Sequence, residues 1–361
     1  MATLLADYSE VNIIETEDYL SDVVPLLKDG NILLVTSQGF RQRGTVATIV
    51  QALGHERVIV FDQVTPNPEK TFIRTHYQQL AEQQITNIVA LGGGSVIDTA
   101  KVFGAMFSYP NQPIEQLLSR NDLTCSINLV GIPTTSGTGA EVTPFATVWE
   151  NKTNSKHSLY GIKPNAALLD PQLTLTLPYT DTLYPALDTL SHALESIWNK
   201  NKTQFSEEAA FYAIELICSA LPKALVEPDN LQARKDLQCA ATLAGLAISI
   251  TKTAIAHAIS YPLTSKYNVP HGLACSFTLL AIVNIHGEKK LGLPSKLMPN
   301  VNKLLAEIDF SNALSSMVSW DDIQGLSKLN FDKSRTGNFI AAVDNDLVAT
   351  ILQKSQILAE L

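Results

Sequence analysis

The feature that most limits the fold of this chain is a change in its hydrophobic pattern near residue 170. Before that point, short apolar runs alternate with stretches of helical periodicity, which is the rhythm of a parallel sheet covered by helices. The predicted strands are 31–35, 57–61, 87–91 and 127–131. The predicted helices of this half are about 39–53, 68–84 and 95–107.

Beyond Asp170 and Pro171 the chain shows helical periodicity without clear strands. The helices predicted there include 180–199, 206–225, 231–259, 271–286 and 296–307. We therefore expect an α/β domain over residues 1–170 and an all-helical domain over residues 171–361. With 361 residues, 45% of them hydrophobic, the chain is long enough to bury two cores.

The helical half contains a set of side chains with the chemistry of metal ligands, namely Asp188, His192, His257 and His271. Asp188 and His192 lie four residues apart in ALDTLSHALESIW, so on a helix both leave the same face one turn apart. Downstream, we expect the helix that carries His257 to end at Pro262, and a new helix to begin at His271. A lone histidine on an apolar helix is usually a core residue, but four such ligands together fit one divalent ion, Fe(II) or Zn(II). The remaining histidines, His55, His76, His157 and His286, have polar neighbours and are expected at the surface.

Two loops rich in small residues follow predicted strands in the first half. In NIVALGGGSVIDTAKVFG, glycines and a serine at 92–95 separate a strand from a helix, where backbone amides can approach a phosphate closely. The spacing is not G-x-G-x-x-G, so the usual dinucleotide fingerprint does not apply. A cluster of Thr, Ser and Gly follows Pro133 in LVGIPTTSGTGAEVTPFATV. Either loop alone is also compatible with a simple packing turn.

With these residues in view, the chain resembles the iron-containing, group III alcohol dehydrogenase family. GGGSVID, PTTSGTGAEVT, the Asp188/His192 pair, and His257 with His271 match that family's motifs in order, and the likeness extends to RTGNFIAAVDNDLVATIL. It implies the dehydroquinate synthase-like fold, with an N-terminal dinucleotide-binding α/β domain, an all-α C-terminal metal-binding domain, and the active site in the cleft between them. Within the family, the chain is most similar to the phosphonoacetaldehyde reductase subgroup.

The resemblance also implies roles for individual residues. A divalent metal, Fe2+ first and Zn2+ second, would polarise the oxygen of a short aldehyde, and NAD(P)H would supply the hydride. Gly93, Gly94 and Ser95 would hold the pyrophosphate, while Asp98 would lie near the nicotinamide. The remaining cofactor-binding candidates are Thr134, Thr135, Thr138 and Lys156, the last of which is equally compatible with a solvated surface lysine.

Two departures from the family pattern bear on specificity. Many members have Asp after the first strand, where this chain has Ser37, and Arg41 and Arg43 follow, so a 2′-phosphate is tolerated and NADP(H) joins NAD(H) as a cofactor. These arginines could also simply decorate a helix surface. Tyr261 stands where many members have a further histidine, so it either transfers protons, positions the substrate or only packs.

Lys252 is the second candidate catalytic residue beside Tyr261. It is expected on the same helix as His257, within a small and apolar run in which a charge is unusual. If that helix lines the cleft, Lys252 could bind an anionic group of the substrate, with phosphonoacetaldehyde as the first candidate. The alternative is a lysine at the helix edge that extends into water.

Composition narrows the partners and the compartment. The cysteines, Cys125, Cys218, Cys239 and Cys275, are far apart and form no CxxC, which argues against disulfides and thiolate metal sites and suits a reducing cytoplasm. A net charge of -9 disfavours nucleic acid as a partner, and no apolar run is expected to span a membrane. The expected ligand is a small aldehyde or alcohol substrate. A homodimer is the assembly that we would expect of the chain.

Two other functions compete with the aldehyde reductase. One is a lyase of the related dehydroquinate synthase fold, whose metal pattern characteristically has Glu where this chain has Asp188. The other is a non-catalytic nucleotide-binding protein, which would not need four metal ligands.

Overall fold

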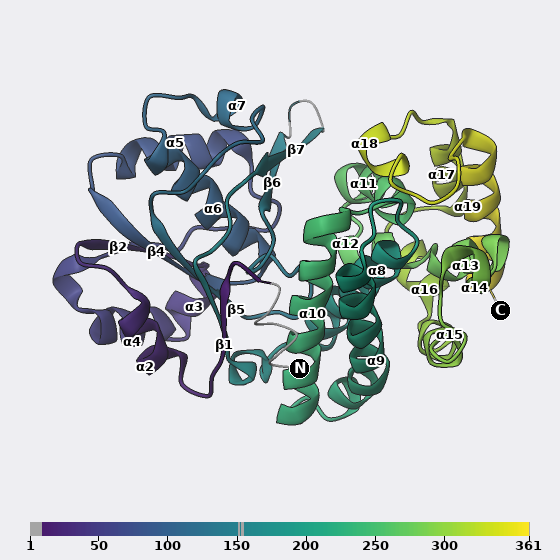
Figure 1. The fold of residues 1–361 in the computed structure, drawn as a ribbon, viewed down its shortest axis with the longest axis horizontal. Coiled ribbons are helices and arrows are strands. Elements are labelled where there is room, and N and C mark those ends of the chain that lie inside the picture. Colours follow the sequence, from purple (N-terminus) through teal and green to yellow (C-terminus); the bar gives the residue numbers. More distant parts are fainter. Residues whose placement is uncertain (1–8, 151, 153–154, 361) are drawn as a thin grey trace. The chain divides into compact units, whose positions relative to one another are not determined.

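The computed structural model describes residues 9–150, 152 and 155–360 and divides them into two compact units. The first unit includes the chain up to Thr135 and the segment Gly139–Leu175, and the second comprises Ser136–Thr138 and Thr176 onward. Figure 1 shows the α/β elements of the first unit in purple to blue-teal, and the helices of the second from teal through green to yellow.

The first unit is built on a six-stranded parallel sheet with the strand order β1-β8-β5-β4-β2-β3. Its strands are β1 (Asn12–Glu15), β2 (Asn31–Val35), β3 (Val58–Phe61), β4 (Ile85–Gly92), β5 (Asn128–Pro133) and β8 (Ala166–Leu169). An antiparallel hairpin, β6 (Phe145–Glu150) with β7 (Ser155–Tyr160), stands apart from this sheet. Its helices are α2 (Tyr19–Val23), α3 (Gln38–Gln42), α4 (Thr45–Leu53), α5 (Lys70–Leu80), α6 (Gly94–Ser108) and α7 (Ile114–Leu117).

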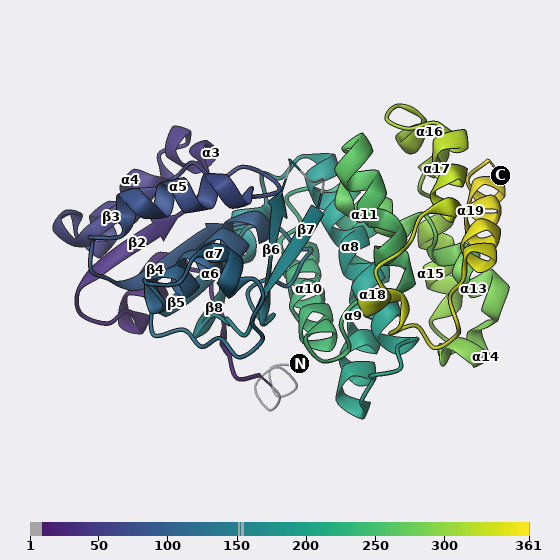
Figure 2. The ribbon, with the colours of Figure 1, turned by 90° about the horizontal axis from the view of Figure 1, so that it is seen from above.

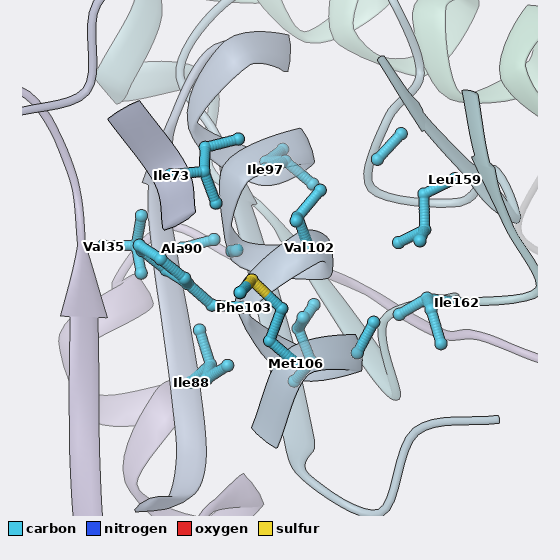
Figure 3. Packing of buried hydrophobic residues seen from close by; sticks show 14 of the residues in the cluster. Val35, Ile73, Ile88, Ala90, Ile97, Val102, Phe103, Met106, Leu159 and Ile162 are labelled. Carbon is cyan, nitrogen blue, oxygen red and sulfur yellow. The ribbon is translucent and has the colours of Figure 1, made fainter. Parts of the chain in front are cut away.

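Alternating side chains of the strands pack into two separate hydrophobic cores, one on each face of the sheet. Leu33 and Val35 of β2 point to one face and pack with residues of α5, α6 and the hairpin, a cluster shown in part in Figure 3. Ile32 and Leu34 point to the other face and pack with residues of α4. Because both faces are covered, the strands are continuously apolar, as expected for a buried parallel sheet.

The chain reverses its winding direction between β2 and β4. From β2 it moves outward to β3, then crosses back to place β4 on the other side of β2, and continues through β5 to β8. In open parallel sheets, ligands bind beyond the carboxyl ends of the strands at such a switch point. The loops after β2, β4 and β5 are therefore the candidate ligand-binding loops of this unit.

The second unit consists of helices and connecting loops, and its described residues form no strand beyond an isolated bridge between Asn199 and Phe339. Its long helices α8, α9 and α10 pack against one another, as Figures 1 and 2 both show. Its first helices are α8 (Tyr179–Ile197), α9 (Gln204–Val226), α10 (Leu231–Thr251), α11 (Ile255–Tyr267), α12 (His271–Ser276) and α13 (Leu279–His286). The remaining helices are α14 (Glu288–Leu291), α15 (Met298–Ala306), α16 (Phe310–Ser315), α17 (Trp320–Gly325), α18 (Lys333–Thr336) and α19 (Asn345–Ala359).

Several predicted elements need correction. The strands β1, β6, β7 and β8 were not anticipated, and the helix expected over 39–53 is split at Gly44, whose φ of 83° is left-handed. The helix expected over 231–259 is also two helices, bent by 106° at a break after Thr251. Lys252 is therefore not on the helix of His257. Finally, Pro262 lies inside α11 and does not end it, since buried residues on both sides hold the helix together.

One helix corrects the expectation that no apolar run is long enough to cross a membrane. By length and composition, α9 passes that test, but 44% of its apolar window is buried inside the structure. Core helices of soluble proteins pass the same test, and α9 packs against both α8 and α10.

Candidate functional site

Two groups of functional side chains form, one in each unit. The first lies at the carboxyl edge of the parallel sheet, where β4 ends at Gly92 and α6 begins at Gly94. The backbone N–H of Thr134, just after β5, donates to the Gly92 carbonyl at 3.2 Å. A side chain on Gly93 would reach within 3.0 Å of Thr135 Oγ1, so only glycine fits between the two loops without displacing the threonine. Gly93, Gly94, Ser95, Thr134 and Thr135 are thereby brought together at the N-terminus of a long helix.

This edge has the properties of an anion-binding site. The first amide groups of α6 have no partners within the helix, and the helix dipole favours negative charge at that end. The site offers backbone N–H donors and small hydroxyl groups, and its glycines leave room for the ligand to approach. These properties suit a pyrophosphate better than a bulky or cationic ligand.

Ser37 follows β2 on the other side of the switch point. It occupies the position before α3 without a capping hydrogen bond from its side chain. Arg41 donates through Nε to the carboxylate of Asp62, which follows β3. Arg43 instead places its guanidinium 4.5 Å from the ring centroid of Phe40. Sequence reasoning found no acidic residue near Ser37, but the neighbouring strand supplies Asp62.

Three other cofactor candidates have different surroundings. Asp98 accepts a hydrogen bond from the Thr147 backbone at 2.8 Å, which ties α6 to β6, and burial raises the pKa of its carboxyl. Lys156 lies on β7 with its Nζ 5.9 Å from the Trp149 ring centroid. Thr138 belongs to the second unit, where the neighbouring Gly137 carbonyl accepts from Thr189 Oγ1 of α8 at 2.9 Å.

The second group is centred on one carboxylate oxygen, Asp188 Oδ1, on α8. Imidazole nitrogens surround it: His257 Nε2 at 3.3 Å, His192 Nε2 at 3.5 Å and His271 Nε2 at 3.8 Å. Cys275 Sγ, one turn after His271 on α12, lies 3.5 Å away. All four predicted metal ligands thus converge, and Cys275 joins them. Ligand atoms of Asp188, His257, His271 and Cys275 lie within 4.8 Å of one another.

Close packing of α12 on α8 makes this convergence feasible. A Cβ on Gly272 would lie 1.7 Å from the Tyr184 carbonyl oxygen, so any side chain there would push the two helices apart. His271 is the residue immediately before this contact and is carried toward Asp188 by it.

Glu195, a fully buried residue of α8, fixes the orientation of His257. Its Oε2 accepts from His257 Nδ1 at 2.7 Å and from the Ala254 backbone at 2.8 Å. Its Oε1 accepts from the backbone N–H groups of Ala256 at 2.6 Å and His257 at 3.2 Å. The carboxylate therefore caps the start of α11, whose first amides would otherwise be unsatisfied, and holds the imidazole by the same contact.

This arrangement requires a positive species between His257 and Asp188. With Nδ1 donating to Glu195, a neutral imidazole presents a lone pair on Nε2 toward a carboxylate oxygen, so a proton or a cation must lie between these acceptors. Burial would lower the pKa of His257, but Glu195 and Asp188 raise it to about 10. Burial would likewise raise the pKa of Asp188, yet the neighbouring histidines hold it well below its usual range.

These residues fit a divalent cation. Two buried carboxylates supply negative charge that a divalent cation would compensate in place of the imidazole proton, and nitrogen and oxygen donors suit Fe(II) and Zn(II). The side chains of Asp188, His192 and His257 are at most 7% exposed, whereas that of His271 is 31% exposed. The group is therefore accessible on the side of His271.

Tyr261 lies on this accessible side. Its ring is stacked on that of His271, with centroids 5.9 Å apart and an interplanar angle of 4°, and it meets the His257 ring edge-on. Lys252, by contrast, is exposed at the break between α10 and α11.

Two protein-family models match this chain, one over each unit. The model described as iron-containing alcohol dehydrogenase matches residues 11–171, and that of the C-terminal region of the same family matches residues 182–329. The chain belongs to the iron-containing alcohol dehydrogenase family.

Individual relatives extend this result. The bifunctional aldehyde-alcohol dehydrogenase of Escherichia coli is 28% identical over 306 residues, covering 78% of this chain and 34% of that protein. The phosphonoacetaldehyde reductase of Streptomyces viridochromogenes is 33% identical over 267 residues, covering 71% of this chain and 67% of that protein. The sulfoacetaldehyde reductase of Bifidobacterium kashiwanohense, solved with NAD+, has the same fold, with a TM-score of 0.83, 24% identity and 97% coverage of both chains. The chain thus spans about a third of the E. coli relative.

These comparisons confirm the predicted fold class, a dinucleotide-binding-type α/β unit followed by a helical unit. The sequence analysis missed Asp62, Glu195 and Cys275. The spacing offered a signal for two of them: Glu195 lies seven residues after Asp188, on the same helix face, and Cys275 lies four after His271. The absence of CxxC had argued against a thiolate metal site, and Cys275 corrects this expectation, because a single thiol lies among the histidines around Asp188.

Proposed function

We propose that this protein is a metal-dependent, NAD(P)H-linked alcohol dehydrogenase that works as an aldehyde reductase. The observation that carries the proposal is the convergence of three histidines and a thiol on Asp188, in a chain of the iron-containing alcohol dehydrogenase family. A divalent cation bound there would act as a Lewis acid on the aldehyde oxygen. Asp188, His192, His257 and His271 would hold the ion, and Glu195 would keep His257 in the correct tautomer.

Tyr261 would act at the accessible side of this group. Its ring, stacked on His271, forms a wall against which a short aldehyde can be oriented, and its hydroxyl is a proton donor for the product oxygen. Replacement by Phe keeps the wall and removes the hydroxyl. A loss in kcat with KM retained would assign proton transfer to Tyr261, whereas unchanged kinetics would leave it a packing role.

The sheet edge would bind the cofactor. The amides at the start of α6, with Gly93, Gly94 and Ser95, would hold the pyrophosphate, and Thr134, Thr135 and Thr138 with Asp98 and Lys156 would complete the site toward the nicotinamide. Ser37 carries no charge that would repel a 2′-phosphate, so we expect NADPH to be used at least as well as NADH. The pairing of Arg41 with Asp62 opposes this preference, because a phosphate must compete with that carboxylate.

We further propose a short aldehyde with an anionic group as the substrate, with phosphonoacetaldehyde first. The 33% identity to a phosphonoacetaldehyde reductase supports this class, as does the position of Lys252 beside the start of α11. The four cysteines form no disulfide in the described part of the chain, which supports a reducing cytoplasm as the compartment, and a homodimer is the oligomer we would test by light scattering.

The test of the proposed function is reconstitution. The protein would be stripped with a chelator, reloaded anaerobically with Fe(II) or Zn(II), and assayed with NADH and NADPH on propanal and phosphonoacetaldehyde. We expect turnover only after metal is restored. Full activity of a rigorously metal-free preparation would contradict the proposal.

A further inference from the structure

The short helix α18 places a cationic side chain, that of Arg335, beside Tyr261. The guanidinium carbon of Arg335 lies 5.0 Å from the Tyr261 ring centroid. Arg335 Nη1 donates to Thr253 Oγ1 at 2.6 Å, whereas its buried Nε has no hydrogen-bond partner. The nearby carboxylate of Asp332 instead accepts from Ser334 through both oxygens. A buried guanidinium N–H without an acceptor lowers the stability of the fold, and a ligand that accepts from it would remove this cost.

Several hydrogen bonds hold Arg335 in this place. Asn338 donates to the Thr253 carbonyl at 2.9 Å, so the segment 335–338 is attached at two points to the break between α10 and α11. At the break, Lys252 has φ 60° and ψ 177°, a conformation found almost only in glycine. Its carbonyl accepts from Asn199 at 3.1 Å and Thr251 at 2.9 Å. Two cationic residues thus flank Thr253, one of them on a strained backbone that is held by its surroundings.

This platform adjoins the accessible side of the Asp188 group. Tyr261 contacts both the guanidinium of Arg335 and the ring of His271, the most exposed of the three histidines around Asp188. The two buried carboxylates would neutralise a bound divalent cation, so the group itself offers an anionic substituent little net attraction. A fixed guanidinium beside it supplies that attraction and gives an anionic substrate one preferred orientation.

We propose that Arg335 is the specificity-determining residue that binds the anionic end of the substrate, a phosphonate or sulfonate group on a short aldehyde. The proposal rests on the proposed aldehyde reductase and deepens it. Guanidinium donors match two oxygens of a tetrahedral oxyanion at once, and the unpartnered Nε supplies one of these donors. Lys252 is exposed and so more strongly screened, and we assign it the smaller, assisting contribution.

The experiment compares Arg335→Ala and Arg335→Lys with Lys333→Ala, a matched control that removes an exposed cation from the same short helix. Metal-loaded proteins are assayed on phosphonoacetaldehyde, sulfoacetaldehyde and propanal. Arg335→Ala should raise the KM for the anionic aldehydes roughly tenfold to a hundredfold more than the KM for propanal, the effect of a lost charge-assisted hydrogen bond. Arg335→Lys should restore part of the difference, and Lys333→Ala should show none. Comparing the two anionic aldehydes distinguishes a phosphonate from a sulfonate substrate.

A second measurement does not depend on turnover of an anionic aldehyde. Ethylphosphonate lacks the carbonyl and should inhibit propanal reduction competitively in the natural protein, with the inhibition lost in Arg335→Ala. Equal changes in KM for all three aldehydes, or unchanged inhibition, would overturn the role of Arg335 while the aldehyde reductase stands. Failure of the natural protein to reduce any aldehyde would overturn the proposed function and this inference with it.

Discussion

The sheet edge of the first unit and the Asp188 group of the second are suited to their expected ligands through different kinds of atom. At the sheet edge, the donors are backbone amides, and space is made by glycines whose missing side chains let two loops meet. Around Asp188, the contacts are made by side chains on three helices, and nearly all of them are buried. The sheet edge therefore depends on residues without bulky side chains, whereas the Asp188 group depends on the chemical identity of each donor side chain.

The difference predicts how each site tolerates substitution. A backbone-built site loses little when a neighbouring polar side chain is replaced, because its amides remain. A site built from side chains loses its ligand when one donor is removed, because the remaining buried charge is no longer compensated. The following substitutions test this contrast, beginning with the largest expected effect.

Replacing His257 or His271 with Ala should abolish metal binding and lower kcat/KM on the order of a thousandfold, since several kcal/mol of Lewis-acid stabilisation are lost. Metal content by elemental analysis and steady-state rates would be measured together. His55→Ala, at an exposed position, is the control. Retention of stoichiometric metal in both variants would refute the assignment of these ligands.

Gly272→Ala should destabilise the second unit by roughly 3 kcal/mol or more, because the added carbon clashes with the Tyr184 carbonyl in the α8 backbone. Urea unfolding with metal present would report the loss. Gly325→Ala is the matched control, because a Cβ there meets nothing within 4 Å. Equal stability of the two variants would show that α12 can move away from α8 at little cost.

Glu195→Gln should weaken metal binding roughly tenfold to a hundredfold, the usual effect of removing a group that orients a histidine ligand. The amide cannot accept from both His257 Nδ1 and the α11 backbone as the carboxylate does. Competition with a chromogenic chelator would give the affinities, with Glu307→Gln, an exposed position, as control. Unchanged affinity would mean that packing alone orients His257.

At the sheet edge, Ser37→Asp should shift the ratio of kcat/KM for NADPH over NADH toward NADH by roughly tenfold, through repulsion of the 2′-phosphate. Asp62→Asn should shift it in the opposite direction, because Arg41 is released from its ion pair. Both ratios would be obtained with one aldehyde at fixed ionic strength. If neither substitution moves the ratio, the adenosine ribose lies elsewhere.

The sequence predicted the features that depend on local periodicity. Asp188 and His192 share a helix face because helices repeat every 3.6 residues, and β2 is apolar on both faces because helices cover both sides of the sheet. The break at Lys252 was not predictable in this way, since no glycine or proline marks it and its cause is tertiary. Glu195 satisfies the amides that the break exposes, and residues 335–338 hold its other side.

The features that the sequence did not predict depend on tertiary contacts and not on local periodicity. Arg335 and Asp62 act through neighbours that are distant in sequence, Tyr261 and Arg41 respectively, so no spacing could associate them. Strands β1 and β8, which pair with each other, are only four residues long. Such short segments show too few repeats for a hydrophobic pattern to identify them. The hairpin of β6 and β7 packs on α6 through buried residues such as Val148 and Leu159.

The contacts of Glu195 have a consequence for metal supply. Its four hydrogen bonds join protein to protein, and none of them requires an ion. The start of α11 therefore stays tethered to α8 when the cation leaves, so emptying and refilling the site need not involve unfolding. Nitrogen and oxygen donors by themselves bind Zn(II) more tightly than Fe(II), so the relative supply of the two metals decides which one is bound. Because exchange does not require unfolding, we expect the ion carried in the cell to change with that supply, in either direction.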